Sequence, residues 1–219
     1  MRTVQAAALA AALALALAAG AMAATPLDLN KVILEPGQVG SAFQLLQRTD
    51  EHGLKTRTLD LCGITNYPSE SLRLTRMQVN YGAIGNDLSL SNEVVTYKAG
   101  GAAQAMSELA QHADHCPKSP VAPGVQGLPP LRFTVTRLAD AKLLPGSVAV
   151  RVRVTGTVSG KHVDQTSYAV YQRFGNVLSG VYSNGPATGD QQSFCLHAAE
   201  QSAINLRKIP SLGETGPTA

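Results

Sequence analysis

The chain has 219 residues, with 18 lysines and arginines against 15 aspartates and glutamates and a net charge of +3. Charged residues make up only 15% of the chain, below the roughly 25% of an average soluble protein, and the cations are spread along it. Because no block of basic residues is present to neutralise phosphates, we expect no nucleic-acid partner.

Residues 1–23 have the parts of a secretory signal peptide. Arg2 supplies the positive n-region, a run of alanine and leucine follows, and an Ala-x-Ala pattern ends at Ala23. We expect cleavage after Ala23 and a secreted, extracellular product. An uncleaved anchor is the alternative, because residues 4–23 nearly reach the ~20 residues that span a bilayer. No cysteine precedes Cys62, which excludes a lipidated-cysteine anchor, and we expect no stable membrane span after cleavage.

The rest of the chain fits one domain, at residues 36–210, after a lead-in at residues 24–35 and before a disordered tail at residues 211–219. Within residues 36–48, Val39, Phe43 and Leu46 have helical spacing, which predicts a short helix. Residues 54–63 fit a short helix or an irregular stretch. Residues 71–81 and 88–97 alternate as strands do and are joined by a turn, which predicts a hairpin.

Residues 99–116 carry the clearest helical pattern, with an apolar stripe and a following proline. The stripe consists of Ala102, Ala105, Met106, Leu109, Ala113 and Cys116. A proline-rich loop is expected at residues 118–130 and a strand at residues 131–138.

Residues 147–182 carry the strongest strand signal, a three-stranded antiparallel meander with turns near residues 159–161 and 175–176. In its first strand Val148, Val150, Val152 and Val154 alternate with Arg151, Arg153, Thr155 and Thr157. A final helix is expected at residues 191–208. Two groups of strands interrupted by one helix and closed by another predict an α+β fold, in which helices pack on a twisted antiparallel sheet.

The three cysteines leave one thiol unpaired in an exported protein. We favour a Cys62–Cys116 disulfide, because both residues lie outside the strand signal and Cys116 ends a helix that packs on the body of the domain. Cys195 falls on the buried face of the final helix, where a small apolar residue fits. Pairing of Cys195 with either other cysteine stays open.

Catalytic motifs are absent from the sequence, so we expect no enzyme, no cofactor and no metal. The strongest metal candidate is the group formed by His112, Asp114, His115 and Cys116, which could ligate zinc if Cys116 were free. A hydrolytic trio of Ser159, His162 and Asp164 would need a geometry that one hairpin does not provide.

One face of the meander is the most suggestive binding surface. Arg151 and Arg153 project from the side opposite the valines, and the returning strand offers Tyr168 and Tyr171, which point to opposite faces. Arginine and tyrosine side chains can bind an anionic or carbohydrate ligand through forked hydrogen bonds and ring contacts. The simpler interpretation is an ordinary solvated sheet face.

The order of several sequence stretches is informative. Ile33 to Gly37 comes first, and Val94 to Tyr97 later runs into a helix that contains Ala102, Ala103 and Ala105 and ends at Cys116-Pro117. Over about residues 30–210 this order resembles the PknH-like extracellular sensor-domain family of exported actinobacterial proteins. The resemblance implies a twisted antiparallel sheet packed by helices and enclosing a cleft. It also implies extracellular ligand sensing or binding without a catalytic residue.

Two departures bear on the role. The sequence shows no kinase, membrane span or lipid anchor, and it has three cysteines where the kinase-attached domain is expected to have two disulfides. We therefore expect a secreted, non-enzymatic binding module whose cleft accepts a small molecule from the cell envelope or the medium. The alternatives are a protein–protein interaction or inhibitor module at the cell surface and, third, a hydrolase.

Overall fold

Seven strands form one antiparallel sheet in the computed structural model, which describes residues 27–51, 54–85, 87–122, 127–185 and 189–209. In chain order the strands are β1 (Phe43–Glu51), β2 (Arg73–Ala83), β3 (Ser89–Tyr97), β4 (Arg132–Arg137), β5 (Val148–Val158), β6 (Lys161–Phe174) and β7 (Val177–Gly185). The helices are α1 (Pro36–Val39), α2 (Gly101–Asp114) and α3 (Gly189–Arg207), with short 3₁₀ turns η1 (Leu29–Lys31), η2 (Leu61–Gly63) and η3 (Pro68–Leu72).

The strand order is β1-β2-β3-β7-β6-β5-β4, with antiparallel pairing throughout. The predicted hairpin and the predicted meander are both present, and they join where β3 pairs with β7. The predicted α+β class, a single domain with helices packed on an antiparallel sheet, is confirmed.

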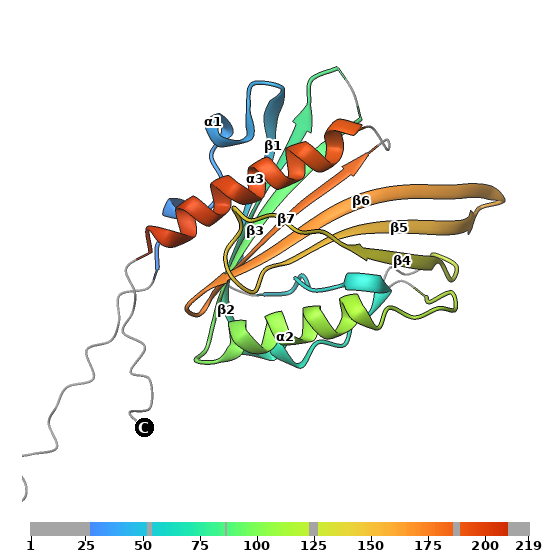
Figure 1. Cartoon of the computed structure of the whole chain (residues 1–219), viewed down its shortest axis with the longest axis horizontal. Coiled ribbons are helices and arrows are strands. Elements are labelled where there is room, and N and C mark those ends of the chain that lie inside the picture. Colours follow the sequence, from blue (N-terminus) through green and yellow to red (C-terminus); the bar gives the residue numbers. More distant parts are fainter. Residues whose placement is uncertain (1–26, 52–53, 86, 123–126, 186–188, 210–219) are drawn as a thin grey trace, which may run out of the picture.

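The two long helices cover opposite faces of the sheet, which we name the α3 face and the α2 face (Figure 1). On the α3 face, α3 packs on β6 and β7 over an apolar core. On the α2 face, the predicted stripe of α2 packs toward β5 and β6. Val148, Val150 and Val152 are buried there, whereas Arg151 and Arg153 are exposed on the other side, as the alternation predicted.

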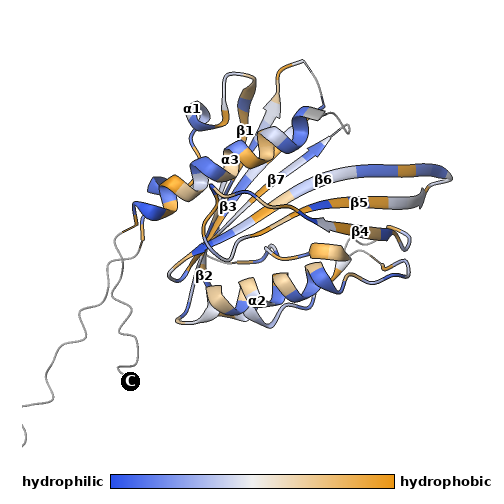
Figure 2. Ribbon diagram, in the orientation of Figure 1, coloured by the Kyte–Doolittle hydropathy of each residue, from blue (hydrophilic) through white to orange (hydrophobic). Residues whose placement is uncertain are grey.

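The β5–β6 hairpin reaches beyond the end of α3, and the part of β6 near the hairpin turn is largely hydrophilic (Figures 1 and 2). The α3 face of this end of the sheet therefore lies outside the area that α3 covers.

The helix predicted within residues 36–48 was wrong beyond its first turn. α1 ends at Val39, Gly40 adopts a φ of 100°, and the chain enters β1 at Phe43. Val39 and Phe43 are buried in the same core, but Leu46 is 61% exposed on the edge strand. The helical spacing of the three residues was a coincidence, because the pairing of β1 with β2 decided the local structure.

Residues 29–34, expected within the lead-in, contribute Leu29, Val32, Ile33 and Leu34 to the core of the α3 face. The expected signal peptide at residues 1–23 and the expected disordered tail at residues 211–219 lie outside the described residues. None of the helices in the described ranges combines the length and the hydropathy that crossing a membrane requires.

Candidate functional site

A half-open cavity of about 380 Å³ lies on the α2 face, between the sheet and residues 54–62, which we name the strap. Strap residues form one wall, and side chains of β2 to β7 form the rest. This volume falls in the range of small-molecule sites, roughly 300–1,000 Å³. Polar side chains predominate along the lining, with apolar contributions from Phe133, Val152 and Val154.

Arg73 holds the strap against the sheet. Its guanidinium donates to the carbonyl of Thr56 at 2.7 Å, to the hydroxyl of Thr58 at 2.8 Å and to the carbonyl of Leu54 at 3.1 Å. The same guanidinium pairs with the Glu70 carboxylate at 3.0 Å, and Glu70 accepts the backbone N–H of Thr58. A buried arginine that is hydrogen-bonded in this way fixes the strap without any regular secondary structure.

A disulfide fixes the other end of the strap. Cys62 is bonded to Cys116 just beyond α2, with their Cα atoms 5.6 Å apart, so the favoured pairing is present. Cys62 has a φ of 63°, a left-handed conformation that non-glycine residues seldom adopt. Cys195 is free and buried in the α3-face core, where burial raises the pKa of its thiol to about 12.

A buried ionic network forms the end of the cavity at β2 and β3. The Arg76 guanidinium is hydrogen-bonded to the Glu93 carboxylate, lies 3.3 Å from the Glu51 carboxylate and donates to Gln78 Oε1 at 2.5 Å. The Tyr182 hydroxyl donates to the other Glu93 oxygen at 3.3 Å. Each charged side chain in this network is paired with an oppositely charged neighbour, so the Arg76 guanidinium has few hydrogen-bond donors free for a ligand.

Glu93 is the member of the network that titrates near neutral pH. Desolvation raises the pKa of its carboxyl group to about 7, and the charge and hydrogen bond of Arg76 oppose that rise only in part. The Thr58 hydroxyl donates to Glu93 at 3.0 Å, which links the strap to the same carboxylate. A change in the protonation of Glu93 therefore acts directly on the strap.

Asp60 has a different environment. It lines the cavity from the strap as an exposed residue, and desolvation by the surrounding chain raises the pKa of its carboxyl group. No hydrogen bond or ion pair to this carboxylate comes from the described residues. Its charge raises the pKa of the phenols of Tyr67, Tyr171 and Tyr182, in addition to their own desolvation. Asp60 is thus an uncompensated anion beside several aromatic rings.

Tyr171 and Tyr182 supply those rings from the sheet. Their centroids lie 5.6 Å apart in an edge-to-face arrangement. Gly180 makes room for the second ring, because a Cβ at that position would overlap the Tyr182 hydroxyl. Burial raises the pKa of both phenols well above the ordinary value, so both stay protonated and can donate hydrogen bonds at neutral pH.

The structure does not bring the four residues of the suggested arginine–tyrosine surface together. Arg151 and Tyr168 are directly opposite each other across the β5–β6 ladder, and Arg153 lies on the same face. Tyr171 is on the opposite face, fully buried in the cavity lining. Binding by any of the four stays a prediction.

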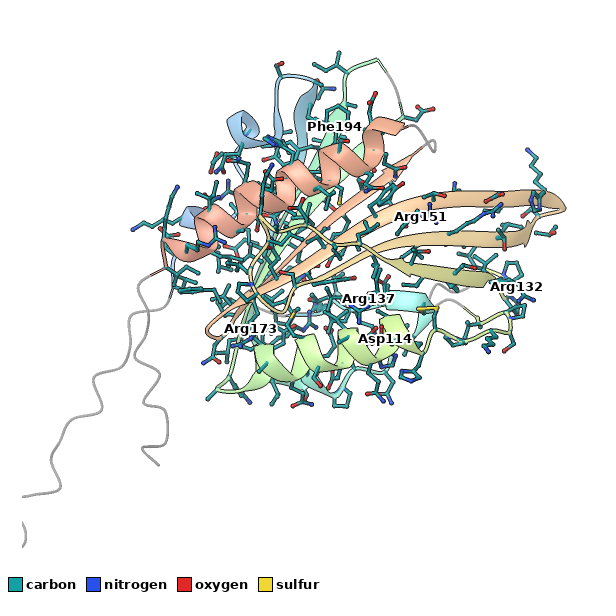
Figure 3. All side chains as sticks on the ribbon, in the orientation of Figure 1. Asp114, Arg132, Arg137, Arg151, Arg173 and Phe194 are labelled. Atoms are coloured by element: carbon teal, nitrogen blue, oxygen red, sulfur yellow. A yellow bond between two sulfur atoms is a disulfide. The ribbon has the colours of Figure 1, made fainter. Side chains whose placement is uncertain are left out.

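Arg151 and Arg153 line a half-open depression of about 500 Å³, together with three threonines and Asp164. Arg153 is engaged by Asp164 through a two-pronged ion pair at 2.5 and 2.8 Å. Arg151 has only a long hydrogen bond to Thr136, at 3.5 Å. Figure 3 labels Arg151 on the sheet and Asp114 at the end of α2. The depression shares no lining residue with the cavity, so the two are separate.

The residues considered for metal binding have other partners. The ring of His112 stacks on Tyr67 with centroids 4.8 Å apart, Asp114 pairs with Arg137 at 2.9 Å, and Cys116 is in the disulfide. Within the described ranges, no three histidine, cysteine, aspartate or glutamate side chains are grouped as a metal site would require. Asp164, considered for a hydrolytic trio, is bound to Arg153.

Sequence reasoning missed the strap, Asp60 and the Arg76–Glu93 pair. The strap carries no periodic pattern, and its position depends on long-range bonds to Arg73 and Cys116. A signal for the ionic pair was present, because an arginine and a glutamate in a predicted hairpin can face each other on one side of a sheet.

The fold and the cavity can be compared with known proteins. No family model matches the chain, and no curated protein matches it. Among solved structures it is similar to the extracellular domain of PknH from Mycobacterium tuberculosis, with a TM-score of 0.52 and 14% identity, covering 81% of this chain and 97% of that chain. The similarity shows a shared fold, and it supports the structural relationship that the sequence resemblance implied.

Proposed function

We propose that the protein is a secreted, non-enzymatic ligand-binding module whose α2-face cavity receives a small molecule from the cell envelope or the medium. The observation that carries the proposal is the cavity itself: a half-open space of about 380 Å³ lined by Tyr171, Tyr182 and the strap residue Asp60, whose carboxylate has no partner among the described residues. An unpaired charge in a desolvated site costs stability, and a ligand that pairs with it removes that cost.

Three further points support the proposal. Residues 1–23 have the pattern of a cleavable export signal, and the Cys62–Cys116 disulfide suits an oxidising compartment. The protein also shares its fold with an extracellular domain. Residues 36–210 would then form the binding domain, extended by the buried side chains of residues 29–34.

A thermal-shift screen tests the proposal. The probes are choline, ethanolamine, N-acetylglucosamine and inorganic phosphate, and a probe at 100 times its Kd stabilises by about 2.7 kcal/mol. We expect at least one probe to raise Tm, and we expect Ala169→Phe, which places a ring in the cavity, to abolish the increase. A screen in which no probe changes Tm would contradict the proposal. Failure of the protein to react with a serine-directed phosphonate is the matching expectation for a non-enzyme.

A second candidate site is the depression around Arg151. The favouring observation is that the Arg151 guanidinium is exposed and lacks a carboxylate partner, beside the threonine hydroxyls of β4 and β6. We propose Arg151 and Arg153, with Tyr168 at the side, as residues that would bind an anion there. Inorganic phosphate in the same screen tests it: Arg151→Ala would remove a phosphate-dependent increase in Tm and leave other probes unaffected.

A further inference from the structure

The charges around the α2-face cavity are unevenly matched. Glu51, Glu70 and Glu93 are each associated with one of two buried arginines, Arg73 and Arg76. Asp60 adds a fourth carboxylate that neither arginine contacts. The cavity therefore presents a negative charge next to its strap wall, and both buried guanidiniums are already engaged by protein groups.

Arg57 is the remaining cation that lines the cavity. It is exposed, and its charge lowers the pKa of Glu70 rather than that of Asp60. The same excess of negative charge affects the pKa values of the tyrosines around the site, in addition to their desolvation. Carboxylate charges contribute to the raised pKa values of Tyr67, Tyr97, Tyr171 and Tyr182. A positively charged group is thus the ligand chemistry that this environment stabilises most.

The rings beside Asp60 are suited to the same chemistry. An ammonium group near the face of a tyrosine is attracted by the ring quadrupole, by about 0.5–2 kcal/mol depending on desolvation. The ring of Tyr182 is only partly buried, so a ligand can reach it, whereas Tyr171 is fully buried and packs edge-to-face on Tyr182 with centroids 5.6 Å apart. Phe133 of β4 lines the cavity as well. A carboxylate and several rings around one space form a recognisable cation-binding arrangement.

We propose that the cavity takes a small organic cation, a primary or quaternary ammonium, whose charge pairs with Asp60 and lies against the ring of Tyr182. The inference rests on the proposed function, because it names the ligand class of the same site. A neutral sugar would leave the Asp60 charge uncompensated, and an anion would face it directly.

Glu93 makes the proposed binding depend on pH. Its surroundings include Arg76, Glu51 beyond that arginine, Glu70, and the phenols of Tyr97, Tyr171 and Tyr182. Of these groups Glu93 is the one whose pKa, at about 7, places its titration near neutral pH. A bound cation favours the ionised form, so cation affinity rises as pH increases from about 6 to about 8 and binding releases a proton.

Calorimetric titration of the whole protein with choline and ethanolamine tests the inference. The matched ligand control is the uncharged analogue of choline in which a quaternary carbon replaces the nitrogen. We expect at least one of the two ammonium probes to bind. If choline binds, its carbon analogue should bind at least about tenfold more weakly. Asp60→Asn should weaken ammonium binding by at least about tenfold, whereas Asp164→Asn, on the other face, should change it less than about twofold.

Stability supplies a second measurement that does not need a ligand. Because Asp60 is desolvated and unpaired, Asp60→Asn should leave Tm unchanged or raise it. A clear decrease would assign Asp60 a structural role and would overturn the inference. Glu93→Gln should remove the pH dependence of ammonium binding while Asp60→Asn removes the binding itself.

The outcomes separate this inference from the proposed function. Equal binding of choline and its carbon analogue, or Asp60-independent binding of N-acetylglucosamine without ammonium binding, would overturn the cation and leave a ligand-binding cavity. Absence of binding by every probe, charged or neutral, would overturn the proposed function as well.

Discussion

The two faces of the sheet are built from the same strands but differ in the kind of polar group they bury. On the α3 face the buried polar side chains are neutral and hydrogen-bonded to one another or to the backbone: Asn92 donates to Ser179 at 2.8 Å, and Ser179 is bonded to Ser202 at 2.7 Å. On the α2 face they include the charged Arg73, Arg76 and Glu93, and the exposed Asp60 nearby has no partner among the described residues. Neutral, satisfied groups stabilise a fold, whereas an unpaired charge is retained at a cost.

The layers that cover the two faces of the sheet also differ. α3 lies over its face as one continuous helix and shares a core with residues 29–34. The α2 face is closed in part by the strap, which is fixed by Arg73 and by the disulfide. We therefore assign support of the fold to the α3 face and the proposed binding site to the α2 face. Four changes test this assignment.

Removing the disulfide should have the largest effect. The bond spans 54 residues, for which the chain-entropy model gives about 4 kcal/mol. We expect Cys62→Ser with Cys116→Ser to lose that stability in urea unfolding and to increase hydrogen exchange in the strap and α2 more than in α3. Thiol titration of the unfolded, unreduced wild-type protein is the control and should detect Cys195 alone. An equal increase in hydrogen exchange on both faces would contradict the assignment of the two faces.

Glu93 should set the pH dependence of stability. Its pKa is about 7 in the folded protein and 4.5 in the unfolded chain, so the folded state binds the extra proton between these values. Stability should therefore fall as pH rises through this window, by on the order of 3 kcal/mol, and level off above it. Glu93→Gln should flatten most of this slope, leaving the smaller parts due to Asp60 and Glu70, whose pKa values burial also raises. Unfolding measured across the window checks this, and a slope unchanged in the variant would contradict it.

Gln172 tests the other face. It accepts the backbone N–H of Leu144 at 3.0 Å and donates to the carbonyl of Ala199 at 2.8 Å, which joins a loop to α3. Gln172→Leu leaves the backbone N–H of Leu144 unpaired, while the Ala199 carbonyl keeps its hydrogen bond within α3, and the change should cost about 2 kcal/mol at every pH. Ligand binding should be unchanged once the variant is folded. A change in probe affinity would show that the two faces are coupled.

The ion pair between Arg153 and Asp164 should matter least. Both side chains are exposed on the hairpin beyond α3, where solvent screens the pair. Salt bridging lowers the pKa of Asp164, yet we expect Asp164→Asn to leave Tm unchanged within error in differential scanning calorimetry. A drop of several degrees would show that the outer end of the sheet contributes to stability.

Regular elements with strong periodicity were predictable from the sequence. The alternating valines of β5 and the apolar stripe of α2 specify which side of each element faces the core. In the structure both apolar sides pack into the core of the α2 face, as expected. The Cys62–Cys116 bond was also favoured from the sequence, because both cysteines lie outside the strand signal and Cys116 ends the predicted helix. For β5 and α2, local spacing alone indicated which side chains are buried.

The rest depends on contacts between distant residues. β1 is an edge strand with mostly exposed side chains, so it lacks the alternation that marks a half-buried strand. The β3–β7 pairing has no local signature, and the strap follows bonds to Arg73 and Cys116 rather than a propensity. The cavity exists only once these contacts form, which is why the suggested surface at Arg151 was visible in the sequence and Asp60 was not.

Tyrosine ring resonances test the central claim most directly, because the six tyrosines are distributed over both faces. Tyr171 and Tyr182 line the cavity, Tyr81 lies in the α3-face core, and Tyr168 is opposite Arg151. The protein, labelled with ¹³C in its tyrosine rings, is titrated with choline and, in a second arm, with N-acetylglucosamine. The account predicts that the probe that binds shifts the resonances of Tyr171 and Tyr182 and leaves that of Tyr81 unchanged. A shift at Tyr81 with Tyr171 and Tyr182 unmoved would contradict it.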